Sequence, residues 1–508
     1  MSLISTRGGA AVTASRAILA GLAPGGGLYV PRAYSLVNHL ELQIMSGQPY
    51  VQRAARVLQA LLDDYTPAEI EGAVEAAYAR FDVPEVAPVR PLRALGGPGG
   101  LGADGTYVLE LFHGPTLAFK DIALQLLPYL ARLAMDKCGE ERELFVLVAT
   151  SGDTGKAALE GFADVPGTRC AVFYPSEGVS EAQRLQMVTQ TGANTHVMAV
   201  RGNFDDAQAG VKRIFADPDF AAGMDARGRM LSSANSINFG RLAPQVAYYF
   251  SAYADLLATG AVTPGQKVHF AVPTGNFGNI LAAEYARRMG LPVGKLLCAS
   301  NSNNVLADFV RTGVYDARRP FYQTMSPSMD ILISSNLERL LFELCGRDGR
   351  TVAGWMRALG EGRPYDIGAD RLRALREVFT ADWVDEQATR GAIRQVWRDA
   401  KYLMDPHTAV AARALMNYRE RTGDCTPAVI VATASPFKFG RDVARALLGD
   451  AAIRGRDDFA CCDLLAEHCN LQVPPSIAEL PALPVRHSAI INASDMAEAL
   501  REIVDSAG

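Results

Sequence analysis

Residues 144–156 read Leu-Phe-Val-Leu-Val-Ala-Thr-Ser-Gly-Asp-Thr-Gly-Lys, an apolar run followed by glycines and hydroxyl-bearing residues. A continuous apolar run of this length is typical of a strand buried on both faces of a parallel sheet. The small polar residues after it are typical of a loop that leads into a helix. This stretch therefore indicates an α/β fold, with the loop at the carboxyl end of a central strand.

The same pattern recurs along the chain, and helical periodicity separates most of the apolar runs. Such alternation predicts an α/β architecture around a mainly parallel sheet. In sheets of this kind, ligands bind beyond the carboxyl ends of the strands. The other predicted strands are 107–112, 170–174, 194–200, 268–272, 296–299 and 428–432.

The first hundred residues differ from the rest, because apolar periodicity predicts helices over 50–63 and 67–81. The glycine-rich stretch 96–102 formally contains GxGxxG, but a proline lies inside it and a strand pattern follows, so we interpret it as a linker or turn. We predict a mainly helical N-terminal domain at 1–100 and a core at 101–508. A smaller α/β lobe at about 130–245 is inserted in the larger lobe of that core. The spacing within the helical stretch 305–425 indicates no function.

Composition excludes several classes of protein. The chain has 508 residues, 49% of them hydrophobic, and a net charge of −5, which gives no support for a nucleic-acid-binding surface. The first residues lack the features of a secretory signal, and no stretch of about 18 apolar residues predicts a membrane span. The eight cysteines are scattered without a Cys-x-x-Cys pair, which favours reduced thiols. We therefore predict a cytoplasmic enzyme or binding protein.

Two strand-end loops have the composition of anion sites. In the loop after 144–149, backbone N–H groups and hydroxyls at a helix N-terminus would favour an anion. The alternative is an ordinary helix start capped by Asp153 or Thr154. In Val272-Pro-Thr-Gly-Asn-Phe-Gly-Asn-Ile280, the glycines would let the main chain wrap around a phosphate, although a plain glycine-rich turn has the same composition.

A third loop, Ala432-Thr-Ala-Ser-Pro-Phe-Lys438, places the neutral hydroxyls of Thr433 and Ser435 at the end of a strand. A simple turn would use these residues equally well.

Lys120 lies in Leu117-Ala-Phe-Lys-Asp121, next to apolar residues. Desolvation would lower the pKa of such a lysine and make it a nucleophile able to form a Schiff base with an aldehyde cofactor. A solvated lysine near a helix start is the simpler interpretation, and spacing alone does not exclude it.

Taken together, these motifs resemble those of threonine synthases, which are fold-type II pyridoxal-phosphate enzymes, and the similarity is to their longer, fungal and enterobacterial-like branch. The resemblance covers nearly the whole chain and implies two α/β lobes with an N-terminal helical domain. The motifs, in order, are Ser5-Thr-Arg7, Gly21-Leu-Ala-Pro-Gly-Gly-Gly-Leu-Tyr-Val-Pro31, Phe112-His-Gly-Pro-Thr-Leu-Ala-Phe-Lys-Asp121, Thr150-Ser-Gly-Asp-Thr-Gly155, Ser232-Ser-Ala-Asn-Ser-Ile-Asn-Phe-Gly-Arg241, Gly275-Asn-Phe-Gly-Asn279 and Ala432-Thr-Ala-Ser-Pro-Phe-Lys-Phe439.

The resemblance implies that the cofactor is pyridoxal 5'-phosphate and that Lys120 is both its Schiff-base lysine and the catalytic residue. Thr433 matches the neutral partner of the pyridine nitrogen, and Asp153 neighbours the phenolic oxygen. The loop that binds the cofactor phosphate corresponds to Gly275, Asn276, Phe277, Gly278 and Asn279.

The resemblance also implies a set of substrate-binding residues and no metal. The planar fork of Arg241 suits a phosphate, but Arg241 paired with a carboxylate, and Asn235 and Asn238 as turn caps, form a structural alternative. His113 is either a site-lining or a structural residue. The implied substrate-binding residues are Ser151, Gly152 and Thr154 for the α-carboxylate, Asn235, Ser236, Asn238 and Arg241 for the phosphate, and His113 and Thr116 near the centre.

One departure is local. Relatives in this branch often have His-Pro-Ala-Lys-Phe where this chain has Ser435-Pro-Phe-Lys-Phe439, which puts a role for a histidine there in doubt. His407 also matches a family pattern, but no catalytic role follows from it.

The implied reaction converts O-phospho-L-homoserine and water into L-threonine and phosphate by β,γ-elimination and replacement, with Lys120 moving protons between neighbouring carbons. Alternatives are a threonine synthase-like phospholyase or a serine/threonine dehydratase on the same fold, or a non-catalytic pyridoxal-phosphate-binding protein. The expected partner is the small-molecule substrate, without nucleic acid or membrane, in a monomer or homodimer.

Overall fold

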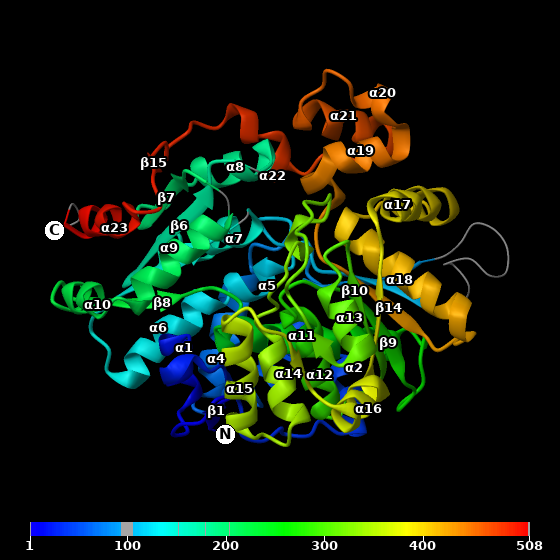
Figure 1. Cartoon of the computed structure of the whole chain (residues 1–508). Helices are drawn as coiled ribbons and strands as arrows, with labels where there is room; N and C mark the ends of the chain where they lie inside the picture. Colours follow the sequence, from blue (N-terminus) through cyan, green and yellow to red (C-terminus); the bar gives the residue numbers. More distant parts are fainter. Residues whose placement is uncertain (1, 93–104, 151, 178, 203, 506–508) are drawn as a thin grey trace.

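The computed structural model describes residues 2–92, 105–150, 152–177, 179–202 and 204–505. It contains two large β-sheets and a group of N-terminal helices (Figure 1). The glycine-rich stretch 96–102 and Ser151 lie outside the described residues. The predicted boundary between 1–100 and 101–508 falls in the same gap, so this division stays a prediction.

The larger sheet has the strand order β13-β10-β9-β14-β4-β3. All neighbouring strands are parallel except β3 and β4, which are antiparallel. The central strand β14 pairs with β9 and β4, so the loops that follow these three strands lie at one edge of the sheet. The strands are β3 (Val89–Pro91), β4 (Thr106–Glu110), β9 (Val268–Pro273), β10 (Val293–Ser300), β13 (Phe379–Trp383) and β14 (Ala428–Ala432).

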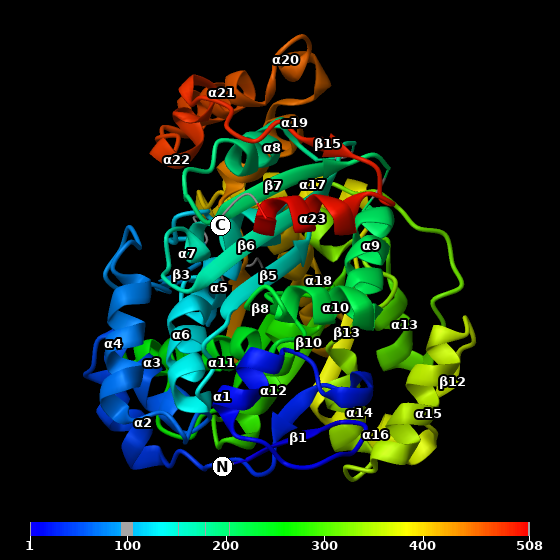
Figure 2. The same ribbon diagram turned by 90° about the vertical axis from the view of Figure 1, so that its left-hand side faces the viewer.

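The smaller sheet is parallel throughout, with the order β15-β7-β6-β5-β8. Alternate side chains of β5 face opposite layers. Phe145 and Leu147 pack with side chains of α9, α10 and α23, and Val146 and Val148 belong to the main core. Figure 2 shows α9 and α23 in front of this sheet. The strands are β5 (Glu143–Ala149), β6 (Thr168–Pro175), β7 (Thr195–Val200), β8 (Arg229–Ser233) and β15 (Ile490–Ile491), and the helices are α9 (Phe204–Ala216), α10 (Pro218–Asp225) and α23 (Met496–Asp505).

Helix α11 (Phe239–Ala258) is buried along most of its length. It packs against helices from both the N-terminal and central parts of the chain, so few of its residues need to be polar. Its neighbours include α2 (His39–Ser46), α3 (Tyr50–Gln59), α5 (Lys120–Leu124) and α12 (Gly278–Arg288).

The N-terminal residues are attached to a helix far along the chain. Strands β1 (Leu3–Ser5) and β2 (Tyr29–Pro31) form an antiparallel pair. Beyond β1, Arg7 donates two hydrogen bonds of 2.8 Å each to the carboxylate of Glu338, and the Thr6 hydroxyl donates a third at 2.6 Å. Glu338 is 4% exposed and belongs to α14 (Leu337–Leu344), so burial makes this bidentate pair sensitive to loss of either partner.

The remaining elements cover the two sheets and the lower edge of the molecule (Figure 1). They are α1 (Ala14–Ala20), α4 (Pro67–Tyr78), α6 (Leu127–Cys138), α7 (Asp153–Phe162), α8 (Glu181–Val188), α13 (Val305–Thr312), α15 (Gly349–Gly360), α16 (Ala369–Val378), α17 (Glu386–Ala400), α18 (Pro406–Thr422), α19 (Gly440–Leu448), α20 (Asp450–Ile453), α21 (Asp458–Cys469), α22 (Pro475–Ala478), β11 (Val314–Tyr315), β12 (Tyr365–Asp366) and the 3-10 turns Pro24–Gly26, Pro327–Met329, Pro436–Phe439 and Leu480–Ala482.

Every strand predicted from an apolar run is confirmed, within a few residues at each end. The two predicted N-terminal helices correspond to α3 and α4. The short edge strands β3, β8, β13 and β15 were not predicted, because short edge strands need no continuous apolar run.

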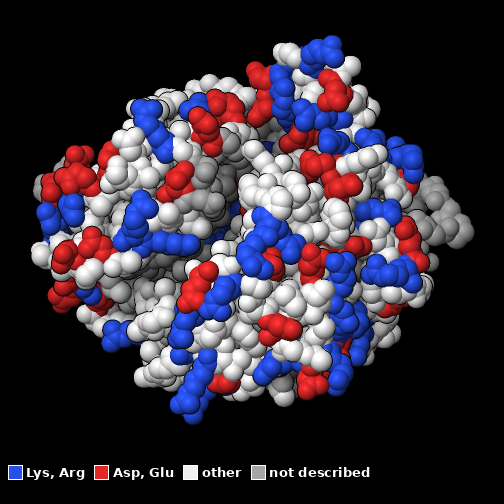
Figure 3. Space-filling model, in the orientation of Figure 1, with Lys and Arg blue, Asp and Glu red and all other residues white. Residues whose placement is uncertain are grey.

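None of the described helices has the length and apolar character needed to cross a membrane. Figure 3 shows basic and acidic side chains interspersed on one face, and a hollow between the part built on the smaller sheet and the part built on the larger one.

Candidate active site

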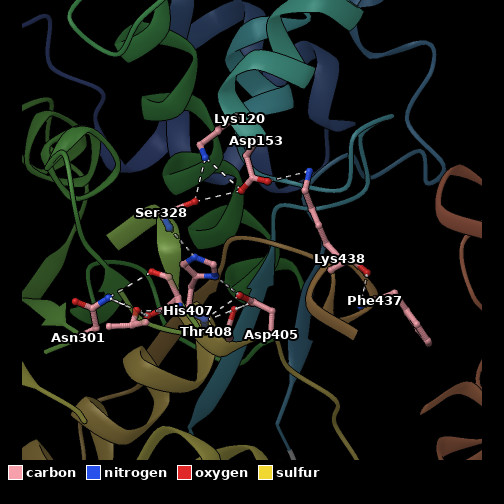
Figure 4. A network of polar contacts seen from close by, with 12 residues as sticks. Lys120, Asp153, Asn301, Ser328, Asp405, His407, Thr408, Phe437 and Lys438 are labelled. Carbon is pink, nitrogen blue, oxygen red and sulfur yellow. Dashed lines mark hydrogen bonds and ion pairs between the residues drawn. The ribbon is translucent and has the colours of Figure 1, made fainter. Parts of the chain in front are cut away.

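Lys120 is the first residue of α5, and its side chain is 12% exposed. Its ammonium nitrogen donates to Asp153 Oδ2 at 3.3 Å and to Ser328 Oγ at 3.1 Å, and Ser328 Oγ also donates to Asp153 Oδ2 at 3.2 Å (Figure 4). Asp153 is the first residue of α7, at the carboxyl end of β5, whereas Ser328 lies in a 3-10 turn. Three segments therefore meet at the Lys120 amine.

A second lysine lies on the other side of the Asp153 carboxylate. The Lys438 side chain is fully buried, with Nζ 3.1 Å from Asp153 Oδ1 and donating to the Thr116 carbonyl at 2.7 Å. Gln183 completes the set by donating to Asp153 Oδ1 at 2.9 Å. Asp153 is thus fixed in position by four side chains, Lys120, Lys438, Gln183 and Ser328.

Burial and charge set the ionisation of this group. Burial lowers the pKa of Lys120, and the positive charges of Lys438 and Arg241 act in the same direction, against the opposing effect of Asp153. Burial alone would raise the pKa of Asp153, but Lys120 and Lys438 hold it well below its ordinary value. The site therefore combines a permanent carboxylate with a lysine that releases its proton more readily than a solvated one.

Arg241, in the first turn of α11, is 3% exposed. It donates to the Ala234 carbonyl at 2.5 Å, while its buried Nε has no partner among the described residues. Burial lowers the pKa of this arginine to about 10. Among the described carboxylates, only Asp153 forms ion pairs with Lys120 or Lys438, and none forms one with Arg241. Two lysines thus share a single carboxylate, and the buried Arg241 near them pairs with no described carboxylate. This excess of positive charge favours an anionic ligand.

The backbone of the loop after β9 makes a tight turn before α12 begins. Phe277 has a φ of +64° and is 1% exposed, and α12 begins at the next residue. A β-carbon on Gly275 would lie 2.6 Å from the Ser328 carbonyl oxygen, so only glycine lets the Ser328 turn pack here. Asn279 is 7% exposed, and its Oδ1 accepts from Tyr248 at 2.5 Å and Tyr249 at 2.6 Å.

Two further predicted residues lie at the ends of neighbouring strands. Thr433 follows β14 and is 6% exposed, and its carbonyl accepts from the Phe119 N–H at 2.8 Å, which ties it to the residue before Lys120. Gly152 follows β5 with a φ of +141°, and a β-carbon there would lie 2.6 Å from the side chain of Gln183. The structure therefore brings Lys120, Asp153, Gly152 and Thr433 to one edge of the two sheets.

A family model described as pyridoxal-phosphate dependent enzyme matches residues 83–434, and one described as threonine synthase N terminus matches residues 2–78. Threonine synthase of Pseudomonas aeruginosa is 41% identical over 453 residues, which cover 89% of this chain and 91% of that protein. The chain belongs to the threonine synthase family of pyridoxal-phosphate-dependent enzymes.

Threonine synthase-like 1 of Homo sapiens is 40% identical over 445 residues, which cover 85% of this chain and only 58% of that protein. Among solved structures, the pyridoxal-phosphate-bound threonine synthase from Brucella melitensis superposes with a TM-score of 0.86 at 36% identity and covers 99% of both chains. The predicted family, fold-type II architecture and cofactor are confirmed.

The described residues fit the family's cofactor, which carries an anionic phosphate. The excess of buried positive charge around Lys120 suits an anion. In addition, the Asn279 Nδ2 is buried without a partner among the described residues, beside the start of α12. A helix N-terminus with a free amide donor is a favourable phosphate site.

Three of the predicted substrate-binding side chains, those of Asn238, Thr116 and His113, already have structural partners. The Asn238 amide donates to the carbonyls of Ile18 at 2.9 Å and Ser233 at 3.1 Å, and its oxygen caps α11 by accepting from the Gly240 N–H at 2.8 Å. Asn235 accepts from the Asn238 N–H through its carbonyl at 3.1 Å, which leaves its partly exposed side chain available, as is that of Ser236. Thr154 lies half-buried in the first turn of α7.

Thr116 and His113 are both held by carboxylates. The Thr116 hydroxyl donates to Asp121 at 2.7 Å, and its N–H donates to the same carboxylate at 2.8 Å. The ring nitrogens of His113 lie 2.7 Å from Asp82 and 2.9 Å from Glu110. These contacts favour a structural role for both side chains over direct contact with a substrate.

Asp121 itself is fully buried next to Lys120. Burial raises its pKa to about 6, although the two hydrogen bonds from Thr116 oppose the shift. Gln125 donates a further hydrogen bond at 3.2 Å. The carboxyl of Asp121 therefore titrates just below neutral pH, in the turn that positions Lys120.

The sequence interpretation missed Lys438 and Ser328, and gave His407 no role. His407 is 2% exposed, its Nδ1 lies 2.7 Å from Asp405, and its Nε2 accepts from the Ser328 N–H at 3.2 Å (Figure 4). This contact makes His407 a support for the Ser328 turn. The presence of Lys438 in the third strand-end loop was the one available signal, and no local pattern distinguishes Ser328 from other serines.

Proposed function

We propose that this chain is a threonine synthase, which converts O-phospho-L-homoserine and water into L-threonine and phosphate. The observation that carries the proposal is the buried Arg241, which faces no described carboxylate and lies near Lys120. A guanidinium in this state is suited to bind an anion that arrives with the substrate. The name of the P. aeruginosa relative, which matches over most of both chains, supports the same reaction.

The residues that would hold the cofactor are Lys120 through its amine, residues 275–279 through their N–H groups, and Thr433 through its hydroxyl. Bound there, pyridoxal phosphate supplies the electron sink that allows bonds at the carbons of an amino acid to break. Thr433 is neutral, so it would not enforce protonation of a ring nitrogen as a carboxylate would.

Lys120 would act as the base and acid of the reaction. Its lowered pKa makes the neutral amine more accessible than that of a solvated lysine, and a neutral amine can take a proton from Cα of the substrate. The same amine would take a proton from Cβ as phosphate leaves Cγ, and would then return a proton to Cγ. When the hydroxyl of water has added at Cβ, a proton returned to Cα completes threonine. Asp153 and Ser328 would hold this amine in place through the 3.3 Å and 3.1 Å contacts.

The substrate would lie between two groups of residues. Gly152 and Thr154, at the N-terminus of α7, would receive the α-carboxylate, together with Ser151, which lies outside the described residues. Arg241, with Asn235 and Ser236, would receive the phosphate. A substrate without a phosphate would leave the buried Arg241 unpaired, which disfavours a serine/threonine dehydratase.

The deciding experiment is a simultaneous measurement of phosphate, threonine, 2-oxobutyrate and ammonia from purified protein and O-phospho-L-homoserine. A threonine synthase releases threonine and phosphate in equal amounts. Release of phosphate with 2-oxobutyrate and ammonia would instead identify a phospholyase. Absence of all products, with the cofactor bound, would overturn the proposal in favour of a non-catalytic binding protein.

A further inference from the structure

The segment Ser334-Ser-Asn-Leu-Glu-Arg339 lies against the loop 275–279 and is tied to it by three hydrogen bonds. The Ser334 hydroxyl donates to the Gly275 carbonyl at 2.7 Å, and the Asn336 N–H donates to the Asn276 carbonyl at 3.1 Å. The Ser335 hydroxyl adds a bond to Asn276 Oδ1 at 3.3 Å. These contacts fix where residue 336 lies relative to the start of α12.

Asn336 is completely buried, and its side-chain nitrogen Nδ2 has no hydrogen-bond partner among the described residues. That nitrogen lies 3.4 Å from the position that a β-carbon on Gly278 would take. Gly278 is the first residue of α12, a helix of 11 residues. The free amide donor therefore points at the helix N-terminus that matches the family's phosphate loop.

The orientation of this amide is fixed by chemistry. The Oδ1 of Asn336 accepts a hydrogen bond from Arg339. A guanidinium has donors and no acceptor, so it must contact the oxygen of the amide and not its nitrogen. Burial of an unpaired amide donor costs free energy unless a ligand satisfies it.

Arg339 is held by carbonyl oxygens, and no carboxylate among the described residues forms an ion pair with it. It is fully buried, and its other nitrogens donate to the Tyr29 carbonyl at 2.9 Å and the Ile237 carbonyl at 2.6 Å. Ile237 lies in the 232–241 stretch that contains Arg241. Arg339 thus links the N-terminal strand pair, the proposed substrate-phosphate segment and Asn336.

We propose that the side-chain amide of Asn336 donates a hydrogen bond to the phosphate of the cofactor, and that Arg339 is the positioning residue that orients this amide. Asn336 thereby adds a side-chain donor to the backbone N–H groups of residues 275–279. This inference concerns the cofactor of the family and does not depend on which phosphorylated amino acid is the substrate.

The test compares binding of pyridoxal 5'-phosphate with binding of pyridoxal, which lacks the phosphate, to full-length protein from which the cofactor has been removed. Dissociation constants are measured from absorbance or fluorescence titrations, so no substrate or turnover is needed. For Asn336→Ala, we expect pyridoxal 5'-phosphate to bind about tenfold to a hundredfold more weakly, as for loss of a hydrogen bond to a charged group. Pyridoxal binding should change less than about twofold.

A second variant distinguishes a loss of phosphate binding from a folding defect. Asn336→Asp keeps the shape of the side chain and the acceptor for Arg339, but it replaces the donor with a negative charge. We expect this variant to melt at or above the temperature of the parent protein, because it gains a pairing with Arg339. It should lose affinity for pyridoxal 5'-phosphate to a greater extent than Asn336→Ala and keep affinity for pyridoxal.

The control is Asn304→Ala. Asn304 also stands at the N-cap position of a helix, α13, and its Oδ1 accepts from an arginine, Arg319, at 2.9 Å. Both ligands should bind this variant as they bind the parent.

Arg339→Lys tests the positioning role, since it keeps the charge and loses the planar fork. It should reduce only the affinity for pyridoxal 5'-phosphate, by about threefold to tenfold. Equal weakening of both ligands by the Asn336 variants, or no change in either, would overturn the proposal. The product assay above tests the proposed reaction separately.

Discussion

Two regions of the molecule build the site, and they contribute different kinds of residues. The strand-end loops contribute groups that would contact cofactor or substrate, such as Lys120, Asp153 and Thr433. The helical stretch 305–425 contributes Ser328 and Asn336, which contact those loops, and His407, which supports the Ser328 turn. The difference teaches that reacting groups and the groups that hold them are placed by separate parts of the fold.

Removal of the Lys120 amine, which belongs to the strand-end loops, should cause the largest loss of activity. Lys120→Ala removes the group that would hold the cofactor and move protons, and we expect threonine formation to fall by a factor of at least about 10³. The visible absorbance of lysine-bound cofactor should also disappear. The exposed Lys212, on α9, provides the control variant Lys212→Ala. If Lys120→Ala formed threonine as fast as the parent protein, Lys120 would not be a reacting group. The distinction between the strand-end loops and the supporting stretch 305–425 would then fail.

Arg241→Met should have the next largest effect. Loss of charge-assisted hydrogen bonds to the substrate phosphate should lower kcat/KM about 10²-fold, mainly through KM. The free energy of unfolding should not decrease, because methionine removes a buried cation that has no carboxylate partner. Steady-state kinetics and urea unfolding measure the two quantities. A large loss of stability with unchanged KM would make Arg241 a structural residue.

Asp121, next to Lys120, should make the stability of the protein depend on pH. The pKa of Asp121, about 6 in the folded protein, lies above the unfolded value of about 3.9. The folded state therefore holds the proton more tightly, so ionised Asp121 destabilises the protein above pH 6, and this cost fades as the pH falls from 6 to 4. The cost at neutral pH is roughly 3 kcal/mol.

Asp121→Asn should remove this contribution. The difference in unfolding free energy between the variant and the parent should be more favourable to the variant at pH 7.5 than at pH 4.5. Urea titrations at both pH values measure this difference. A constant difference would mean that Asp121 does not titrate in this range.

A smaller effect is expected from the supporting region. Ser328→Ala removes one acceptor for Lys120 and one donor to Asp153, each worth about 1 kcal/mol, so kcat should fall by up to about thirtyfold with little change in KM. Rapid-mixing or steady-state kinetics would show it. An effect as large as that of Lys120→Ala would place Ser328 among the reacting groups and break the distinction between the regions.

The smallest effect should come from His113→Gln. Both ring nitrogens of His113 contact carboxylates of Asp82 and Glu110, so we expect kcat/KM to stay within about twofold of the parent. A tenfold rise in KM would return His113 to the substrate-binding set.

The strands and the loops after them could be predicted because apolar runs and glycine-rich turns are local patterns. Lys120 and Thr433 are predicted from these patterns and the family resemblance. Ser328 could not be found in this way, because its importance comes from Lys120, 208 positions away in the sequence. Asn336 gains its role only from the loop at 275–279 and from the guanidinium beside it.

Two other predicted site residues have partners that the sequence does not reveal. Asn238 and Thr116 have side chains that suit ligand binding, and the same hydrogen-bonding ability suits helix caps and turns. Only the positions of Ile18, Ser233 and Asp121 show which use this chain makes of them.

The attachment of the first residues to α14 has a consequence for how the protein acquires its cofactor. Thr6 and Arg7 contact Glu338 across more than 330 positions of sequence, and the neighbouring Arg339 contacts Tyr29 across 310. Contacts between such distant residues form late, since the chain must first close a long loop. A cofactor held through Asn336 therefore requires that these distant parts of the chain have already met.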